Sequence, residues 1–389
     1  MEFKLTKIDP YICSIEELEK EIETLELKKD EYNGIQNAIK VFMNSVYGAC
    51  ASPWFECYNV KVAEAITLQG QHISKYISEV IDNYFINKWH LDKKLHEDLH
   101  LTYVNKINEK TCTIYGDTDS RFFTFDPALK SCDYSGDPTE FILLIKKLRL
   151  DSYLKQHFEE YAKQYNTKNV QDLELEKIAY SAIMIAKKKY ILDLAWNSSG
   201  VHFLPQEKIK HVGIEIVQGS TPKFAKKVLK ELVKLVCNKK KDLQYAEVVK
   251  QLKAYKQEFL MQNPNDIAIT KSIGDYEKYI LEDRKELRLA EKCPINVRSS
   301  GIYNFKLRNS KWKSKYNLLK TGDKVKYYYA KSEENVFGFL PGNFPVEFAP
   351  EVDYDLQFAK TIIDPFSRII ETLGFQKIPE SLIYSRSLF

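Results

Sequence analysis

The segment Thr111–Phe125, TCTIYGDTDSRFFTF, carries the strongest local signal in the chain. Two runs rich in β-branched and aromatic residues, Thr111–Tyr115 and Arg121–Phe125, flank five residues that favour tight turns, so the pattern predicts a β-hairpin. Its tip would carry two carboxylates, Asp117 and Asp119, which are suitable ligands for Mg²⁺. Because Asp is also a common turn residue, the two carboxylates alone leave a purely structural role open.

The composition is that of an ordinary globular protein. The 389 residues are 44% hydrophobic and 29% charged, which is typical of roughly two or three folded domains. The net charge of +4 neither requires nor excludes nucleic acid. No apolar run approaches the ~20 residues of a membrane span, and the seven cysteines include no C-x-x-C pair. We therefore expect no membrane association and a cytoplasmic protein, in the host cell if the protein is viral.

The N-terminal region has the pattern of a long amphipathic helix. Ser14 and Glu17 form a capping-box signature, and the apolar residues that follow are spaced by three and four. These apolar residues are Ile15, Leu18, Ile22, Leu25, Tyr32, Ile39, Met43 and Val46. A helix of about 30 residues would be ~45 Å long, and Asn33-Gly34 is a place where it could bend or break. Such a stripe must pack either on this chain's own core or on a helix of another chain.

A strongly basic stretch lies near the C-terminus, between residues 298 and 331. Its ten cations face a single acidic residue, Asp323. The cations are Arg298, Lys306, Arg308, Lys311, Lys313, Lys315, Lys320, Lys324, Lys326 and Lys331. Aromatic residues lie among them, at Tyr303, Phe305, Trp312, Tyr316 and 327–329. This combination is typical of a nucleic-acid surface, and a solvated basic face is the alternative.

Three motifs together resemble those of family B DNA polymerases. YGDTDS at Tyr115–Ser120 resembles their motif C, and KVFMNSVYG at Lys40–Gly48 resembles their motif B, K-x-x-x-N-S-x-Y-G. KKKY at Lys187–Tyr190 resembles the K-K-x-Y segment that follows the primer–template duplex. The motifs occur in the family order, and the flanking residues 66–70 and Gly213–Lys223 look closest to the T-even bacteriophage branch. The resemblance covers almost the whole chain.

The resemblance implies an α+β fold. It would comprise a polymerase palm with an antiparallel sheet that includes the motif C hairpin, a long fingers helix and a mainly helical thumb. The implied boundaries are residues 1–52 for the partial fingers, 53–214 for the palm and 215–389 for the thumb. The implied activity is template-directed transfer of a nucleotide from dNTP to a primer 3′-hydroxyl with two Mg²⁺ ions.

Motifs C and B would form the reaction site. By resemblance, Asp119 is the principal metal ligand and Asp117 a secondary or outer-shell carboxylate. On a helix, the motif B residues Lys40, Asn44, Tyr47 and Gly48 share one face. Lys40 would neutralise the incoming triphosphate, Asn44 would hydrogen-bond near the nascent base pair, and Tyr47 with Gly48 would form a flat wall. A buried helix end is the alternative interpretation.

A second group of residues would contact primer–template DNA. By resemblance, the lysines of the KKKY segment contact the backbone and minor groove, and its tyrosine contacts the primer strand near its end. Further cations of the thumb would grip the duplex. The predicted DNA-binding residues are Lys187, Lys188, Lys189, Tyr190, Lys223 and Arg298.

One family motif has no match. Motif A, an Asp-x-x-Ser-Leu-Tyr-Pro segment that precedes motif B and supplies the other metal-binding Asp, is absent from the sequence. The chain is therefore either a piece of a longer polymerase or the C-terminal subunit of a split one, and we expect the second. An N-terminal polymerase subunit would then supply motif A and the 3′–5′ exonuclease. Ser387–Phe389 resembles the start of a clamp-binding tail, which makes a sliding clamp a further candidate partner.

Two rival functions compete with a polymerase. His96, Glu97 and His100 match H-E-x-x-H, which on a helix would form a zinc-peptidase site, although a solvent-exposed helix or loop is the simpler interpretation. The second rival is a non-catalytic DNA-binding relic of a polymerase. The presence of Asp117 and Asp119 argues against it, because a retired site has no physical need for paired carboxylates.

Overall fold

The structure is a computed structural model that describes residues 13–117, 120–132, 134–239, 242–282 and 286–384. Its internal contacts divide the chain into two compact units, Met1–Asp172 and Leu173–Phe389, which are described separately here. The predicted domain boundaries after residues 52 and 214 stay predictions.

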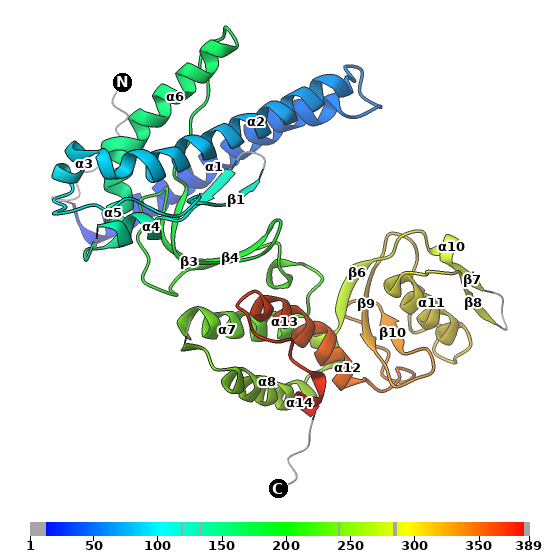
Figure 1. Cartoon of the computed structure of the whole chain (residues 1–389). Helices are drawn as coiled ribbons and strands as arrows, with labels where there is room; N and C mark the ends of the chain where they lie inside the picture. The colour runs from blue at the N-terminus through cyan, green and yellow to red at the C-terminus, as the bar shows by residue number, and fades with distance from the viewer. Residues whose placement is uncertain (1–12, 118–119, 133, 240–241, 283–285, 385–389) are drawn as a thin grey trace. The chain divides into compact units, whose positions relative to one another are not determined.

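Two long helices dominate the first unit. Helix α1, Ile15–Cys50, runs without interruption through 36 residues, so Asn33-Gly34 does not break it. The predicted capping box is present, because Ser14 Oγ accepts the Glu17 N–H at 3.3 Å and the Glu17 carboxylate accepts the Ser14 N–H at 2.9 Å. Helix α2, Val60–Asn83, lies alongside α1 (Figure 1). The Tyr47 hydroxyl and Thr67 Oγ1, 3.2 Å apart, join the two helices.

The apolar stripe of α1 is not covered within its unit. No residue of α1 is buried, and the stripe residues Ile15 and Met43 remain 75% and 67% exposed. As far as the first unit is described, its own core therefore does not bury this stripe. The apolar stripe therefore remains available for contact with another chain.

The rest of the first unit packs shorter elements around α2. They are η1 (Tyr84–Lys88), η2 (Trp89–Leu91), α3 (Lys93–Asp98), β1 (Thr113–Asp117), β2 (Ser120–Phe123), α4 (Asp126–Ser131), α5 (Pro138–Ile145), η3 (Lys146–Leu150) and α6 (Asp151–Gln164). Trp89 is fully buried at the centre of an aromatic cluster with Phe85 and Phe141. The Trp89 indole N–H donates to Ser131 Oγ at 2.8 Å, which satisfies its polar atom in the core.

The second unit begins with a three-stranded antiparallel sheet in the order β3-β4-β5. Its strands are β3 (Lys177–Ala186), β4 (Lys189–Asn197) and β5 (Ile209–Val212). A mixed region follows, with η4 (Glu215–Val217), α7 (Lys223–Lys239), α8 (Tyr245–Leu260), α9 (Pro264–Ile267), β6 (Ile269–Ser272), α10 (Tyr276–Tyr279), β7 (Ile280–Glu282), β8 (Leu287–Leu289), α11 (Ile295–Arg308), β9 (Lys324–Tyr329), β10 (Val336–Phe339), α12 (Tyr354–Phe358), η6 (Ala359–Ile363), α13 (Asp364–Glu371) and α14 (Glu380–Tyr384).

The sheets confirm the α+β class. Strands β10-β9-β6 form a second three-stranded sheet, and β7 pairs with β8. Every strand pair of the described residues is antiparallel. Helix α11 packs on β9 and β10, and α7, α8 and α13 bury a shared apolar core that includes Leu232, Phe259 and Phe366 (Figure 1).

The aromatic residues of the basic stretch are mostly core residues. Tyr303 and Tyr328 are fully buried and Tyr327 is 3% exposed, and all three belong to the apolar core of the second unit. Tyr316 is also buried. The expectation that these tyrosines lie among the cations on a nucleic-acid surface is therefore wrong. They belong to different elements, with Tyr303 on helix α11 and Tyr327 and Tyr328 side by side on strand β9.

Buried tyrosines make the stability of the second unit sensitive to alkaline pH. Burial raises the pKa of Tyr327 and of Tyr303 to about 12. Above pH 10 an unfolded tyrosine releases its proton while the folded one keeps it, so stability is full below pH 10 and is lost toward pH 12. We expect Tyr327→Phe to reduce this loss by about 1.4 kcal/mol per pH unit, measured by urea unfolding at pH 9, 10 and 11. An unchanged pH slope in the variant would contradict the assignment.

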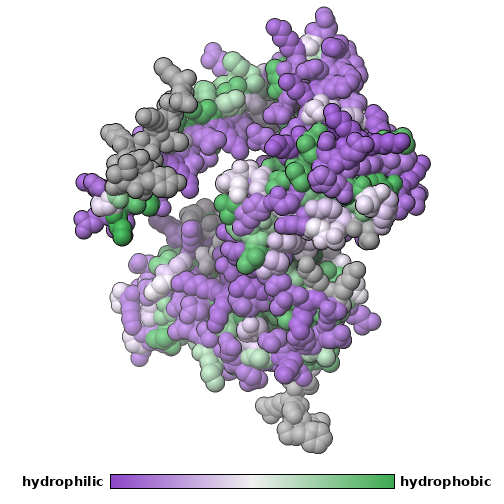
Figure 2. Space-filling model, turned by 90° about the vertical axis from the view of Figure 1, so that its left-hand side faces the viewer, coloured by the Kyte–Doolittle hydropathy of each residue, from purple (hydrophilic) through white to green (hydrophobic). Residues whose placement is uncertain are grey.

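Most of the surface on the face shown in Figure 2 is hydrophilic, with hydrophobic residues in scattered patches. Among the described residues, no helix combines the length and the apolar character of a membrane span.

Candidate functional site

The predicted hairpin is formed, and its strands reach further into the motif than the sequence pattern suggests. Strands β1 and β2 pair antiparallel, with Gly116 opposite Arg121 and Asp117 opposite Ser120. The strand pairing thus extends through Asp117 and Ser120, which were expected to belong to the five-residue turn. Asp117 ends β1 and is half-buried, whereas Asp119, the predicted principal ligand, lies outside the described residues.

A carboxylate on α2 fixes the start of the hairpin. Asp82 accepts the backbone N–H groups of Cys112 and Thr113 at 2.7 and 3.0 Å, and the hydroxyl of Thr111 at 2.7 Å. Asp82 belongs to no motif, so the sequence alone does not single it out as a support of the hairpin. One signal was available, since an acidic residue near the C-terminal end of a helix is unfavourable for the helix dipole and needs another partner.

The donor chemistry at the hairpin fits Mg²⁺, but the described residues hold only part of a ligand set. Asp117 supplies carboxylate oxygens, which Mg²⁺ prefers. Across the part of the chain that the structure describes, no three His, Cys, Asp or Glu side chains lie close enough to hold one metal ion. The described residues thus supply one carboxylate, Asp117, of the predicted pair.

The motif B residues lie on an accessible helix face. Lys40, Asn44, Tyr47 and Gly48 are all exposed on α1, so the interpretation of a buried helix end is wrong. A Cβ atom added at Gly48 would have no described atom within 4 Å, which leaves this face open to a ligand. The hydrogen bond to Thr67 holds the Tyr47 ring against α2. Because α2 also contacts β1 and β2, it supports both motif B and the hairpin.

The KKKY segment forms a second hairpin, between β3 and β4. Lys187 and Lys188 are exposed in a two-residue turn, and Lys188 has a φ of +61°. Lys189 and Tyr190 are half-buried at the start of β4, where Tyr190 pairs with Met184 of β3.

Gly213 buttresses this turn. Its φ is +65°, and a Cβ atom added there would lie 2.0 Å from the carbonyl oxygen of Lys188. The backbone after β5 therefore packs directly against the turn that presents Lys187 and Lys188, and only glycine allows the approach.

The remaining predicted DNA-binding residues differ in their accessibility. Lys223 is exposed at the start of α7. Arg298 is half-buried, and its guanidinium donates to the backbone carbonyl of Glu334.

Several cations of the basic stretch are bound within the fold. Lys315 and Lys331 form ion pairs with Glu347 and Glu351 at 2.5 and 2.6 Å, and Lys326 donates to the carbonyl of Asn265 at 2.6 Å. Exposed lysines remain at Lys311, Lys313, Lys320 and Lys324. The basic surface is therefore smaller than the sequence charge suggests.

The HExxH geometry is not formed. Helix α3 ends at Asp98, before His100, which has a φ of +55°. The other histidine, His96, uses its Nε2 in a hydrogen bond of 2.7 Å with the carbonyl oxygen of Trp89. The two imidazoles are thus not on one helix face, and the zinc-peptidase interpretation is wrong.

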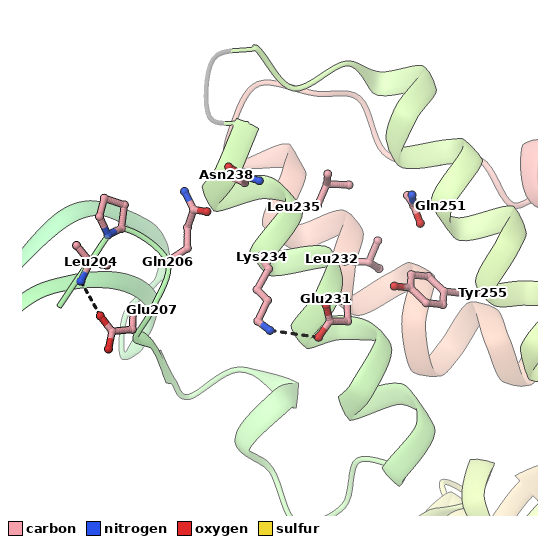
Figure 3. A pocket seen from close by; sticks show the side chains of 11 residues that line it. Leu204, Gln206, Glu207, Glu231, Leu232, Lys234, Leu235, Asn238, Gln251 and Tyr255 are labelled. Carbon is pink, nitrogen blue, oxygen red and sulfur yellow. Dashed lines mark hydrogen bonds and ion pairs between the residues drawn. The ribbon is translucent and has the colours of Figure 1, made fainter.

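A pocket of about 620 Å³ lies in the second unit, between the segment after β4 and helices α7 and α8 (Figure 3). Glu231 and Lys234 in its wall pair at 3.4 Å, and Glu207 accepts the Leu204 N–H at 2.7 Å. None of the predicted site residues lines it.

Comparison with known proteins agrees with the geometry of these motifs. The model of DNA polymerase family B matches residues 16–132 and 145–373. The chain is 26% identical over 313 residues to the DNA-directed DNA polymerase of Escherichia phage RB69, covering 77% of this chain and 31% of that one. It is 23% identical over 359 residues to the enzyme of Enterobacteria phage T4, covering 86% and 36%.

A eukaryotic relative matches over an even larger share of the chain. The DNA polymerase delta catalytic subunit of Candida albicans is 25% identical over 375 residues, covering 94% of this chain and 30% of that one. The chain thus spans about a third of the length of these relatives. Since the family model covers most of its residues, including the two hairpins and the exposed helix face, the chain belongs to DNA polymerase family B.

Proposed function

We propose that this chain is the part of a family B DNA polymerase that contains motif B of the fingers, the palm and the thumb. It would take part in transferring a nucleotide from dNTP to a primer 3′-hydroxyl. The observation that carries the proposal is the common support of two motifs by one helix. Helix α2 holds the Asp117 hairpin through Asp82 and meets the exposed face of motif B through Tyr47 and Thr67.

The residues of α1 suit the recognition of an incoming nucleotide. Lys40 and Asn44 are exposed one helical turn apart, so an ammonium and an amide can face one ligand. Lys40 would neutralise triphosphate charge, and Tyr47 with the open backbone at Gly48 would form a flat wall against the nascent base pair.

The hairpin carboxylates would hold the divalent cations. Asp119 would be the principal ligand, and Asp117 would serve as a secondary or outer-shell ligand. Two Mg²⁺ ions, when bound, would lower the pKa of the primer hydroxyl and brace the phosphates. The pairing of Asp117 with Ser120 would hold the base of the hairpin tip that carries them.

The exposed lysines of the β3–β4 turn would contact the backbone of the duplex, together with Lys223. Each phosphate neutralised by a cation releases counterions, so the affinity for duplex DNA should fall steeply with salt. We expect the double substitution of Lys187 and Lys188 by Ala to reduce the slope of log Kd against log salt by about 2, measured by fluorescence anisotropy. Lys163→Ala, which changes an exposed lysine of α6, is the control. An affinity that does not respond to salt would contradict the assignment.

We further propose that an N-terminal polymerase subunit completes the site with motif A and contributes the exonuclease. The exposed apolar stripe of α1 supports a protein partner, since Ile15 and Met43 would otherwise remain in water. A sliding clamp is a second candidate partner, through Ser387–Phe389, which lies outside the described residues.

The test is a tagged pull-down of the chain from its native cells, with Mg²⁺-dependent primer extension measured on the eluate and on the chain alone. A stoichiometric partner that carries motif A, with synthesis only by the complex, would support both proposals. Synthesis by the chain alone would exclude the need for a partner. Duplex binding without synthesis in either sample would favour the non-catalytic relic.

A further inference from the structure

Arg121 joins the carboxylate hairpin to helix α2. Its Nη1 donates to the backbone carbonyls of Asp117 and Ser120, both at 3.2 Å. Its Nε donates to the carbonyl of Ser74 at 3.0 Å and to the hydroxyl of Ser78 at 2.8 Å. One half-buried side chain therefore contacts the last residue before the turn, the first residue after it and the supporting helix.

Gly116 makes room for this side chain. A Cβ atom added at Gly116 would lie 1.8 Å from Nη1 and 2.4 Å from Cζ of Arg121. The φ of Gly116 is not in the left-handed region, so its backbone conformation suits any residue. The glycine is thus required by the position of the guanidinium and not by the turn.

These contacts give the turn a fixed base. A guanidinium is planar, always charged and carries five N–H donors, so it can hold several carbonyl oxygens in one rigid arrangement. Loss of these donors would free the carbonyls on both sides of residues 118 and 119. Asp117, at the end of β1, would then lose its tie to α2.

We infer that Arg121 is a positioning residue, which sets where Asp117 lies by tying the end of β1 and the start of β2 to α2. The effect of Arg121 on nucleotide transfer rests on the proposed function. Its effect on cation binding at the hairpin can be measured without that function.

The first test is a double-mutant cycle on thermal stability with Gly116→Ala, Arg121→Ala and both together, in the full chain. We expect Gly116→Ala alone to lower Tm by several degrees, because the new methyl group displaces Arg121. In the Arg121→Ala background the same change should cost about 1 °C or less, since the obstacle is gone. Equal effects in both backgrounds would overturn the steric pairing.

The second test measures Mn²⁺ binding by electron paramagnetic resonance in the complex of each variant with the partner chain that completes the proposed site. We expect Arg121→Ala to weaken Mn²⁺ binding about fivefold to tenfold and Arg121→Lys to recover part of the loss, because an ammonium can replace some donors. Lys155→Ala, on the exposed face of α6, should bind as the wild type does. Unchanged binding in Arg121→Ala, or no binding by the wild type, would overturn the inference.

Primer extension by the complex separates this inference from the proposed function. Arg121→Ala should lower kcat about tenfold or more and raise the Mg²⁺ concentration for half-maximal rate, with KM for dNTP within about twofold. A merely structural role would leave both quantities unchanged at a temperature where the variant is folded, and that result would overturn the inference. If Mn²⁺ binding is weakened by Arg121→Ala but the complex does not extend primers, the proposed function fails and the inference stands.

Discussion

Asp119→Asn is expected to lower primer extension by the assembled enzyme at least ~10³-fold and to leave its affinity for duplex DNA within about twofold. The amide keeps the shape of the side chain but removes the negative charge that would hold the cation. Since we propose that DNA binding depends on lysines of the β3–β4 turn and the thumb, loss of this charge should not weaken it. Single-turnover extension and anisotropy titrations on the same preparation measure the two effects.

Asp117→Asn is the matched control for this prediction. It changes the neighbouring carboxylate of the same turn, at the end of β1, and as a secondary ligand it should cost only about 10-fold to 100-fold. Synthesis retained by Asp119→Asn would remove Asp119 as the principal ligand. A parallel loss of duplex binding would mean that the substitution disturbs the hairpin as a whole.

Gly213→Ala is expected to lower the free energy of unfolding by about 2–4 kcal/mol and to weaken duplex binding by about 10-fold. Backbone strain and a steric clash both contribute. Alanine would be strained at a φ of +65°, and its Cβ would lie 2.0 Å from the Lys188 carbonyl oxygen. Because that oxygen belongs to the backbone, the clash can be relieved only by moving the turn. Urea unfolding and DNA titration measure the two quantities.

Gly200→Ala separates strain from collision. Gly200 also has a positive φ, +78°, but no atom lies within 4 Å of the added methyl group. Its substitution should cost only about 1 kcal/mol and leave DNA affinity unchanged. If the two variants lose equal stability, the contact between Gly213 and the Lys188 turn has no energetic importance.

The sequence predicted the elements that local patterns determine. The capping box at Ser14 starts α1 as expected, and turn residues flanked by β-rich runs give the first hairpin. Motif spacing also placed Lys40 and Asn44 on one helix face, which the structure shows to be exposed. These features depend on residues that are close in sequence, where helix and hairpin rules apply directly.

The supports of the site could not be predicted, because they are contacts between distant segments. Asp82 reaches Cys112 across 30 residues, and Arg121 reaches Ser74 across 47. No spacing rule connects such pairs. The prediction for the aromatic residues of the basic stretch was wrong for a related reason. Charge and aromatic content do not reveal that Tyr303 and Tyr328 are buried in the core.

The shared role of α2 has a consequence for how this part of the protein can vary. The helix touches motif B at Thr67 and the carboxylate hairpin at Ser74, Ser78 and Asp82. A small rotation of α2 about its own axis would displace both sets of contacts together. Substitutions that shift this helix should therefore disturb the motif B face and the carboxylate hairpin together, so the two segments are not free to vary independently at α2.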